Sequence, residues 1–493
     1  DGPSLGGFVC PVTIAKAELW KVGQVKPGDR IRFHRIGFDQ ALQLEQAQDA
    51  SIERLALVQA PMPAVAVAPT RSPVCETFNS EYADRPGQPA VAYRQAGDRY
   101  ILVEYGPMVL DLALRMRIHA LMQELRARPI PGILELSPGV RSLQVNYDSR
   151  VIPQRRLMDA LLAAEQRLAP VDDMKVSTRI VRLPMAWQDS ATLDAVARYR
   201  QSVRDTAPWL PSNVEFMRRI NGLDTVEQVR DIVFNTSYLI LGLGDVYLGA
   251  PCAVPLDPRH RLLTSKYNPA RTYTAEGTVG IGGVYMCIYG MDSPGGYQLI
   301  GRTLPIWNKF LKNSGFKPGE PWLLKFFDQV QFYPVEEAEL TQMREAFREG
   351  KLSVDAREEV FDFAAYNRFL QQIEPDVASF RTRQKAAFDA EVALWQADAG
   401  AAGGVVEEAA AAPAAEVDGH VVAAEISGNV WKLLVEPGAV VKQGDALLVI
   451  EAMKMEFAVH APVAGVVRAV QCRQGRPVAA GDTLLVIAEA QAA

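Results

Sequence analysis

The C-terminal part of the chain contains an internal repeat, which constrains the fold more than any other feature. Residues 427–452 align with residues 464–489 at a constant offset of 37 positions, so that Gly428 corresponds to Gly465. Each copy reads as short aliphatic strands separated by turns such as Pro-Gly and Gly-Asp. Two such copies predict a small flattened β-barrel with pseudo-twofold symmetry over residues 421–488, in which each half buries the apolar face of the other.

The junction between the two copies is the segment EAMKMEF, residues 451–457. In a two-copy barrel this junction is a tight turn that projects from one end, so Lys454 would stand exposed on a long flexible stem. Ala452-Met453-Lys454-Met455 resembles the attachment motif of the biotin carboxyl carrier family, whereas lipoyl domains usually have Asp-Lys-Ala there. The resemblance implies that a biotin protein ligase attaches biotin to Lys454. A chance hairpin with Met on both sides of a Lys is the alternative.

The segment before the repeat has a composition that does not support a packed fold. Residues 398–420 are mainly Ala, Gly, Pro and Glu, which predicts a flexible linker. Fully extended, it would span on the order of 70 Å. Residues 341–397 are predicted to be a helical segment, with Ser353 as an N-cap and Pro375 between two helical runs. A swinging tether suits a carrier that visits two active sites, and a passive linker has the same composition.

Residues 91–175 have the periodicity of a small α/β sandwich with an antiparallel sheet. A strand at 99–106 is followed by an amphipathic helix, then by two strands within 132–148 and by a second helix. The apolar stripes of the two helices, which we assign to the core, are Leu114, Ile118, Leu121 and Leu125, and then Leu157, Leu161, Ala164 and Leu168.

Residues 176–340 consist mostly of predicted strands, with helices near 192–206 and 224–232. The segment 279–291, VGIGGVYMCIYGM, reads as a buried strand interrupted by glycines, and paired glycines follow in 292–308. Glycines in strands mark bulges or places where a ligand approaches the backbone. No Gly-Lys-Ser/Thr sequence follows these glycines, so the pattern disfavours a nucleotide site.

Four segments of this region carry a more specific resemblance: LGLGDVYLGAPCAVPLDPRHRL, TSKYNPARTY, GTVGIGG and SPGGYQLIGRT. They are similar to the carboxyltransferase domain of urea carboxylases, whose two halves are related to the bacterial KipA and KipI proteins and each contain a cyclophilin-like β-barrel. The resemblance implies that residues 1–90 close the first half. Residues 91–175 and 176–340 would then be the small α/β subdomain and the barrel of the second half.

The expected fold is therefore mostly β with α+β parts, in the order barrel, sandwich, barrel, helical segment, linker and biotinyl barrel. The start of the first half and a biotin carboxylase domain are not recognised in the chain. The chain, which opens at Asp1, thus resembles the C-terminal portion of a larger enzyme. ATP, magnesium and bicarbonate would be used only in the biotin carboxylase domain, and we expect no ATP consumption by these residues alone.

The resemblance implies transfer of a carboxyl group from carboxybiotin to a urea nitrogen, which gives allophanate. Such a site needs donors on the urea oxygen, acceptors for its amides, a group that polarises the ureido oxygen of biotin and a route for one proton. We expect Lys266 to polarise biotin, and Gln298 and Arg302 to hold substrate or biotin. The other candidates, each of which could instead be a turn or strand-end residue, are Tyr267, Asn268, Asp245 and Tyr247, with Asp1 and Ser4 for substrate.

Composition excludes several other classes of function. The formal net charge is −6 without a Lys/Arg-rich run, which disfavours nucleic acid as a partner. No stretch approaches the roughly 18 apolar residues of a membrane span, and no signal peptide is recognisable. Five scattered Cys and five scattered His suit a reducing cytoplasm and disfavour a metal cluster.

Two rival functions stay open at this point. A guanidine carboxylase would use the same machinery on a cationic substrate, for which Asp1 is a candidate partner. A non-catalytic regulatory module of the KipA or KipI type is the other rival, and the biotinyl domain argues against it. Whether an allophanate hydrolase accompanies the enzyme also stays open.

Overall fold

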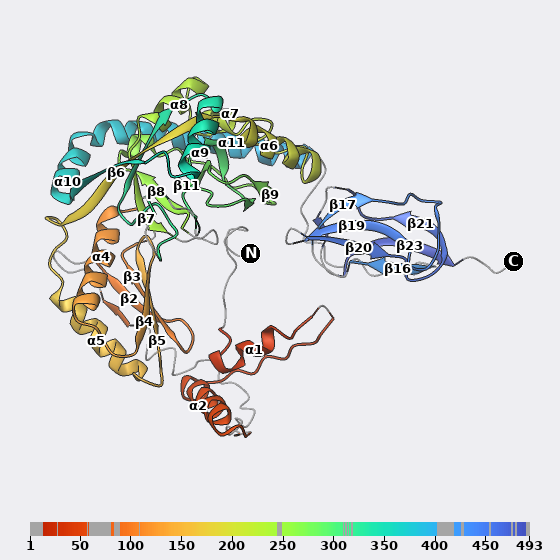
Figure 1. Ribbon diagram of the computed structural model, residues 1–493, viewed down its shortest axis with the longest axis horizontal. Helices are drawn as coiled ribbons and strands as arrows, with labels where there is room; N and C mark the ends of the chain where they lie inside the picture. Colours follow the sequence, from red (N-terminus) through yellow and green to blue (C-terminus); the bar gives the residue numbers. More distant parts are fainter. Residues whose placement is uncertain are drawn as a thin grey trace. The chain divides into compact units, whose positions relative to one another are not determined.

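The structure is a computed structural model, and it falls into two units that are described separately (Figure 1). One unit comprises residues 8–178 and 359–372, and the other comprises 1–7, 179–358 and 373–493. The residues that the structure describes are 13–26, 28–56, 58, 80–82, 89–107, 109–243, 249–308, 310, 313, 315–316, 319–401, 419–424, 428–452, 455–474, 477–478 and 481–489.

The first unit contains the predicted α/β sandwich. Its sheet has the order β1-β2-β3-β5-β4, and all neighbouring strands are antiparallel. The helices α4 (Leu112–Ala127) and α5 (Gln154–Arg167) carry the two predicted apolar stripes into one core with the sheet. The predicted order of strands and helices is confirmed. The strands are β1 (Ser80–Tyr82), β2 (Val91–Gln95), β3 (Tyr100–Tyr105), β4 (Ile133–Pro138) and β5 (Ser142–Tyr147).

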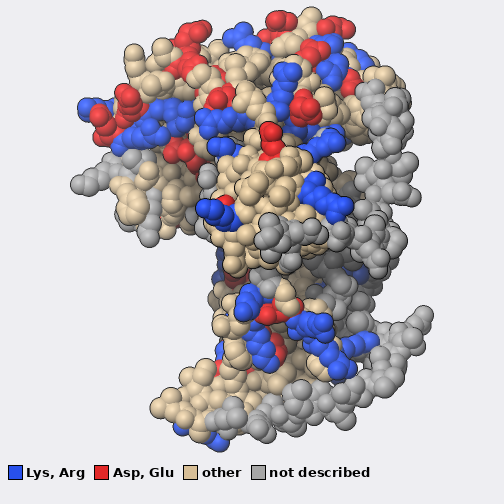
Figure 2. Space-filling model, turned by 90° about the vertical axis from the view of Figure 1, so that its right-hand side faces the viewer, with Lys and Arg blue, Asp and Glu red and all other residues tan. Residues whose placement is uncertain are grey.

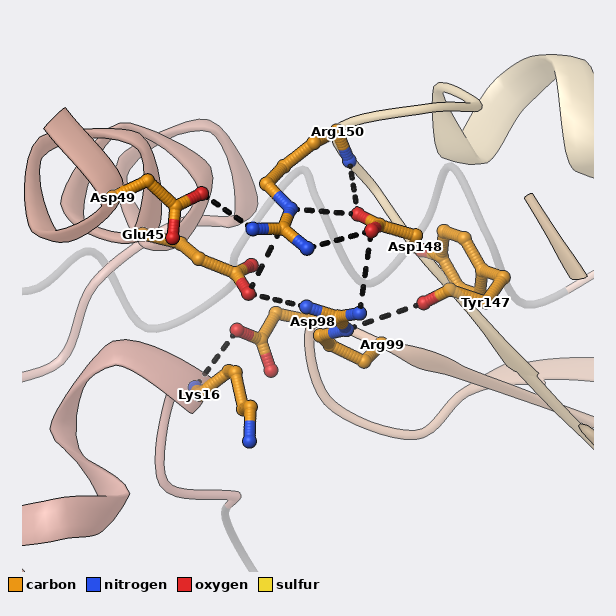
Figure 3. Close-up of polar contacts among 8 residues, drawn as sticks. All are labelled: Lys16, Glu45, Asp49, Asp98, Arg99, Tyr147, Asp148 and Arg150. Atoms are coloured by element: carbon orange, nitrogen blue, oxygen red, sulfur yellow. Dashed lines mark hydrogen bonds and ion pairs between the residues drawn. The ribbon is translucent and has the colours of Figure 1, made fainter. Parts of the chain in front are cut away.

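A charged network joins the sandwich to the segment that precedes it, which contains η1 (Lys16–Glu18), α1 (Leu19–Val22) and α2 (Phe38–Arg54). Arg99, in the turn just before β3, donates to the Glu45 carboxylate of α2 and, at 3.3 Å, to the Tyr147 carbonyl oxygen. We call this charged network the α2 network. Figure 3 shows its eight residues, which are Lys16, Glu45, Asp49, Asp98, Arg99, Tyr147, Asp148 and Arg150.

The second unit contains a closed barrel. Its sheet has the order β13-β10-β11-β8-β7-β14-β6-β15, and β13 also pairs with β6, so all of these strands except β15 form a ring. The large apolar core lies between these strands and the adjoining helices. The strands are β6 (Lys175–Trp187), β7 (Tyr238–Leu243), β8 (Pro251–Pro255), β10 (Thr278–Gly282), β11 (Tyr285–Ile288), β13 (Gln298–Arg302), β14 (Gln329–Pro334) and β15 (Asp355–Asp362).

Helices flank the barrel, and two of them were predicted. The expected helices near 192–206 and 224–232 correspond to α6 (Ser190–Ser202) and α8 (Val226–Phe234). Between them lies a short helix that was not predicted, α7 (Asn213–Ile220). The remaining helices of this unit are α9 (Glu337–Arg348) and α11 (Glu374–Ala401), whereas α10 (Phe363–Gln372) belongs to the first unit.

The prediction of a helix from Ser353 onward is wrong for its first part. Residues 355–362 form β15, which is added to the sheet beside β6. Most of β15 is exposed, so its side chains show no apolar alternation, and backbone pairing with the sheet decides its conformation. Pro375 separates α10 from α11, as expected, and it occupies the second position of α11, where the missing N–H is not needed.

The C-terminal domain confirms the symmetry of the repeat. It consists of two four-stranded sheets, β16-β23-β21-β18 and β20-β19-β17-β22. Three strands of the first copy, β17 (Gly428–Leu433), β18 (Val440–Val441) and β19 (Ala446–Ala452), recur 37 residues later as β21 (Gly465–Val470), β22 (Pro477–Val478) and β23 (Thr483–Glu489). The remaining two are β16 (His420–Ala423) and β20 (Met455–His460), and one apolar core joins both halves.

The predicted mixture of sheets and helices with a β-rich biotinyl domain is thus confirmed. On the face drawn in Figure 2, basic and acidic side chains lie interspersed among uncharged ones, as is usual for a folded domain surface. Among the described residues, none of the helices has the length and apolarity to cross a membrane. Within that same part of the chain, His, Cys, Asp and Glu do not form a group of three that would hold a metal ion.

Candidate functional site

The candidate site is formed where the loop 261–268 lies against the first residues of β13. The Tyr267 amide donates to the Gly296 carbonyl oxygen at 2.7 Å. The Gln298 side-chain amide donates to the Ser265 carbonyl oxygen at 2.9 Å. The structure therefore brings Lys266, Tyr267 and Gln298 together from two segments that are about 30 positions apart in the sequence.

Lys266 and Asn268 point away from the barrel, and Tyr267 between them is buried. The Lys266 ammonium nitrogen lies 5.4 Å from the centre of the Tyr297 ring, within the range of a cation–π contact. The Asn268 carbonyl oxygen accepts a hydrogen bond from Arg204 at 3.1 Å. The loop thus presents one charged side chain and one amide side chain to solvent.

The contacts of Tyr267 are those of a buried residue that supports the fold. Its hydroxyl accepts a hydrogen bond from the Asn213 side-chain amide at 2.6 Å, and the Arg271 guanidinium carbon lies 4.3 Å from its ring centre. Tyr199 and Trp209 pack against the same ring. Burial raises the pKa of Tyr267, so its hydroxyl is neutral and unsuited to act as a base near neutral pH. We interpret Tyr267 as the residue that seats the loop.

Gln298 is fully buried where it contacts the loop at Ser265. Its side-chain nitrogen is bonded to Ser265, as described, but its oxygen has no hydrogen-bond partner among the described residues, and neither does the Ser265 hydroxyl. A buried polar atom without a partner costs about 1–3 kcal/mol. Such atoms are often found where a ligand supplies the missing partner. Gln298 Oε1 is an acceptor, which suits an amide N–H.

The structure places Arg302 in a different group. Its Nε donates to the Glu276 carbonyl oxygen at 2.8 Å, and the Glu276 carboxylate is bound by Arg344 at 2.8 Å and by Arg348 at 3.1 Å. Although Gln298 and Arg302 are four residues apart on β13, only Gln298 contacts the loop that bears Lys266. Arg302 therefore belongs with the Glu276 cluster.

The glycines near the site accommodate the protein's own aromatic rings. A β-carbon on Gly295 would lie 2.2 Å from the Tyr289 hydroxyl, and one on Gly282 would lie 2.4 Å from the Tyr297 ring. The register between β10 and β13 also shifts next to Gly280, which confirms the bulge that the glycines indicated. The paired glycines are thus explained by close packing and irregular pairing.

Six other predicted residues lie outside the described residues. This applies to Asp1, Ser4, Asp245, Tyr247, Met453 and Lys454. In the carrier, β19 ends at Ala452 and β20 begins at Met455, and these two residues are paired with each other. Lys454, the predicted attachment residue, therefore falls in the sequence between two paired strands.

Residues that the sequence did not single out hold the loop from both ends of α7. At its start, Asn213 donates to the Tyr267 hydroxyl and accepts from the Leu299 amide at 2.8 Å. Just after its end, Asn221 accepts from the Leu263 amide at 2.7 Å and donates to the Leu263 carbonyl oxygen at 2.9 Å. A signal for α7 was present, since Ser212 caps it by accepting from the Glu215 amide at 3.2 Å, in a Ser-x-x-Glu pattern.

Comparison with known protein families and structures agrees with this architecture. Residues 91–316 match the family model "Carboxyltransferase domain, subdomain C and D", and residues 1–35 match "Carboxyltransferase domain, subdomain A and B". Residues 402–487 match "Biotin-requiring enzyme". The urea amidolyases of Lachancea kluyveri and Saccharomyces cerevisiae are 45% and 41% identical to the chain, and each alignment covers 99% of it.

The chain is thus homologous over nearly its whole length to urea amidolyases and urea carboxylases. Its fold also matches the crystal structure of Kluyveromyces lactis urea carboxylase, with a TM-score of 0.77 and 40% identity over 98% of the chain. The chain spans about a quarter of the length of the two urea amidolyases, 27% and 26%, and 42% of the K. lactis protein. It corresponds to the carboxyltransferase and biotin-carrier portion of these relatives.

Proposed function

We propose that this chain transfers a carboxyl group from its biotin carrier to a urea nitrogen, which gives allophanate. The observation that carries the proposal is the contact between the Lys266 loop and Gln298, whose oxygen is buried and without a partner among the described residues. The names of the relatives, urea amidolyase and urea carboxylase, support urea as the acceptor.

The carrier domain fits covalent biotin. Its two sheets bury a common core, and the strands on either side of Lys454 pair up to Ala452 and Met455. A lysine between two paired strands has a rigid base and a long side chain, which suits a group that must reach a second site. When attached, biotin supplies the carboxyl group that is transferred.

The residues of the site have complementary roles in this proposal. Lys266 is exposed, so its ammonium group is accessible to a visiting carrier and can polarise a ureido oxygen. The Gln298 oxygen accepts an N–H of the acceptor, which orients the nitrogen lone pair toward the incoming carboxyl group. As the new bond to the acceptor nitrogen forms, the bond between the carboxyl carbon and the biotin nitrogen would break. The proton lost by the acceptor nitrogen would pass to that biotin nitrogen.

The other steps of the cycle need partners. A biotin protein ligase would attach biotin to Lys454, and a biotin carboxylase domain would load the carrier at the expense of ATP, with magnesium and bicarbonate. We propose that both the ligase and the biotin carboxylase domain act on the carrier of this chain.

The test uses the biotinylated chain with a separately supplied biotin carboxylase, ATP, magnesium and bicarbonate, and measures acceptor-dependent ADP release. We expect urea to stimulate the rate, and Lys266→Met to reduce that stimulation by about 100-fold, because a preorganised charge at the reacting group is lost. Lys351→Met is the matched control, since Lys351 is exposed and pairs only with Glu349 in its salt bridge.

Three outcomes would change the proposal. A preference for guanidine would keep the transfer and change the acceptor. An equal effect of Lys266→Met and Lys351→Met would remove Lys266 from the site. If neither urea nor guanidine stimulates ADP release by a chain whose biotin is fully loaded, the proposed transfer is wrong and a regulatory binding role gains support.

A further inference from the structure

We propose that α11, the helix that leads to the carrier, is a working part of the acceptor site. Gln384 of α11 and Asn221 after α7 would be positioning residues that set the place of the Lys266 loop. The inference rests on the proposed function, because it takes Lys266 as a residue that acts in the transfer. It assigns to α11 a role beyond that of a stalk.

Asn221 is the centre of this arrangement and is fully buried. Its side-chain nitrogen donates to the Met217 carbonyl oxygen at 2.7 Å and to the Leu263 carbonyl oxygen at 2.9 Å. Its side-chain oxygen accepts from the Leu263 amide at 2.7 Å and from the Gln384 side-chain amide at 2.7 Å. A primary amide offers two donors and two acceptor positions, so every one of them is used.

Gln384 extends the same set of bonds to a second point on the loop. Its side-chain nitrogen also donates to the Arg261 carbonyl oxygen at 2.9 Å. One amide group of α11 therefore binds the residue that holds Leu263 and binds the loop backbone itself. Lys266 follows Leu263 by three residues, so a shift of this anchor moves the base of the segment that carries the ammonium group.

α11 packs closely against the residues at the end of α7, which restricts the movement of Gln384 relative to the loop. Gly222 has φ +63°, and a β-carbon there would lie 3.1 Å from the Ala387 β-carbon and 3.3 Å from the Arg383 carbonyl oxygen. Further along α11, Glu391 accepts from Arg219 at 2.6 Å and from the Trp395 indole at 3.0 Å. α11 is thus bonded to Arg219 in the last turn of α7 and to Asn221 just after that helix, so it cannot slide along α7 without breaking these polar contacts.

We call these bonds among Asn213, Asn221, Gln384 and the loop the amide network. Asn213 holds Tyr267 at the far end of the loop, and Asn221 with Gln384 holds its near end. A displacement of about 1 Å in a reacting group can cost as much as 100-fold in rate. The network therefore links the helix that carries the biotinyl arm to the geometry of the acceptor site.

The decisive variant is Gln384→Met in the full biotinylated chain, assayed by urea-dependent ADP release with supplied biotin carboxylase. Methionine keeps the length of the side chain and removes its hydrogen bonds. We expect kcat to fall about 10-fold with biotin loading unchanged, because the loop keeps its Asn221 contacts but loses its brace. The matched control is Lys385→Met, the next residue, which is exposed and pairs with Asp389.

Two further measurements separate positioning from general destabilisation. Hydrogen exchange of peptides that cover 261–268 should speed up in Gln384→Met, while exchange of β10 and β11 stays at the level of the Lys385→Met control. In the double variant with Lys266→Ala, the rate should be within about twofold of Lys266→Ala alone, because both changes act on the same group.

The outcomes distinguish the two proposals. If Lys266→Ala leaves the rate unchanged, the proposed function loses its site residue, whatever Gln384 does. If Lys266→Ala is impaired but Gln384→Met behaves like Lys385→Met, α11 is only a stalk and the inference is wrong. It is also wrong if the effects of Lys266→Ala and Gln384→Met multiply in full, since independent effects indicate unrelated causes.

Discussion

The α2 network and the amide network both join segments that are distant in the sequence, but they use different chemistry. In the α2 network, two arginines, Arg99 and Arg150, bind the carboxylates of Glu45, Asp49 and Asp148 (Figure 3). In the amide network, Asn213, Asn221 and Gln384 bind backbone groups and one hydroxyl, and Gln384 also binds the Asn221 side chain; all of these groups are neutral.

The difference shows what each region requires. Charged contacts act over several ångströms and tolerate small shifts, but they depend on pH and on salt. Neutral amides bond only in a narrow geometry, and their bonds do not change with pH in the usual range. A loop that must hold Lys266 in one place benefits from the second kind, and the docking of a helix such as α2 is satisfied by the first.

The largest expected effect lies in the α2 network. Arg99→Met leaves Glu45, which is only 4% exposed, without its buried partner, and removal of one member of a buried ion pair costs about 3–5 kcal/mol. We expect a loss of about 3 kcal/mol in the free energy of opening of β3 and β5, measured by hydrogen exchange.

The control for Arg99→Met is Arg128→Met, because the Arg128 side chain is 62% exposed and pairs with Glu124 on the same helix. An exposed pair of this kind contributes less than about 0.5 kcal/mol. Equal losses in the two variants would mean that the α2 network is not the strong charged contact that the comparison requires.

The second effect concerns the amide network. Asn221→Ala leaves the Leu263 N–H and carbonyl oxygen without their side-chain partner in a buried place, which costs about 2 kcal/mol. The loss should appear as faster exchange of the amides in 261–268, and it should be the same at pH 4 and pH 8. A loss that varied with pH would show that the network depends on a charged group, and the contrast between the two regions would fail.

Much of the fold was predictable from the sequence, because periodicity and repetition report local structure directly. The offset of the repeat places three strands of each carrier half at their observed positions, and the stripes of α4 and α5 point to their core. Residues 355–362 were mispredicted, since the pairing of an exposed edge strand with β6 leaves no periodicity in the side chains.

The candidate site was predictable only in part. The resemblance singled out Lys266 and Gln298, but only the fold shows that Gln298 contacts the loop that bears Lys266 and that Arg302 lies instead with Glu276. The amide network was not recognised, because Asn and Gln carry no pattern that distinguishes a buried bond from a surface side chain. Gln384 and Asn221 are also 163 positions apart, which no local signal spans.

The smallest expected effect tests the pH dependence of the α2 network. Hydrogen bonds from the Arg150 side chain lower the pKa of Asp148 from its usual 3.8 to about 2. Because the pKa is lower in the folded state, the contribution of Asp148 to stability is present above about pH 4 and is lost as the pH falls toward 2. Asp148→Asn should cost about 1 kcal/mol at pH 7, since Arg150 is 34% exposed and is partly rehydrated in the variant.

Between pH 4 and pH 2, the stability of β3 and β5 should fall more steeply in the unmodified chain than in Asp148→Asn, as followed by hydrogen exchange. Parallel slopes for the two proteins would show that the carboxylate of Asp148 is not stabilised by Arg150, and the predicted pH sensitivity of the α2 network would then be wrong.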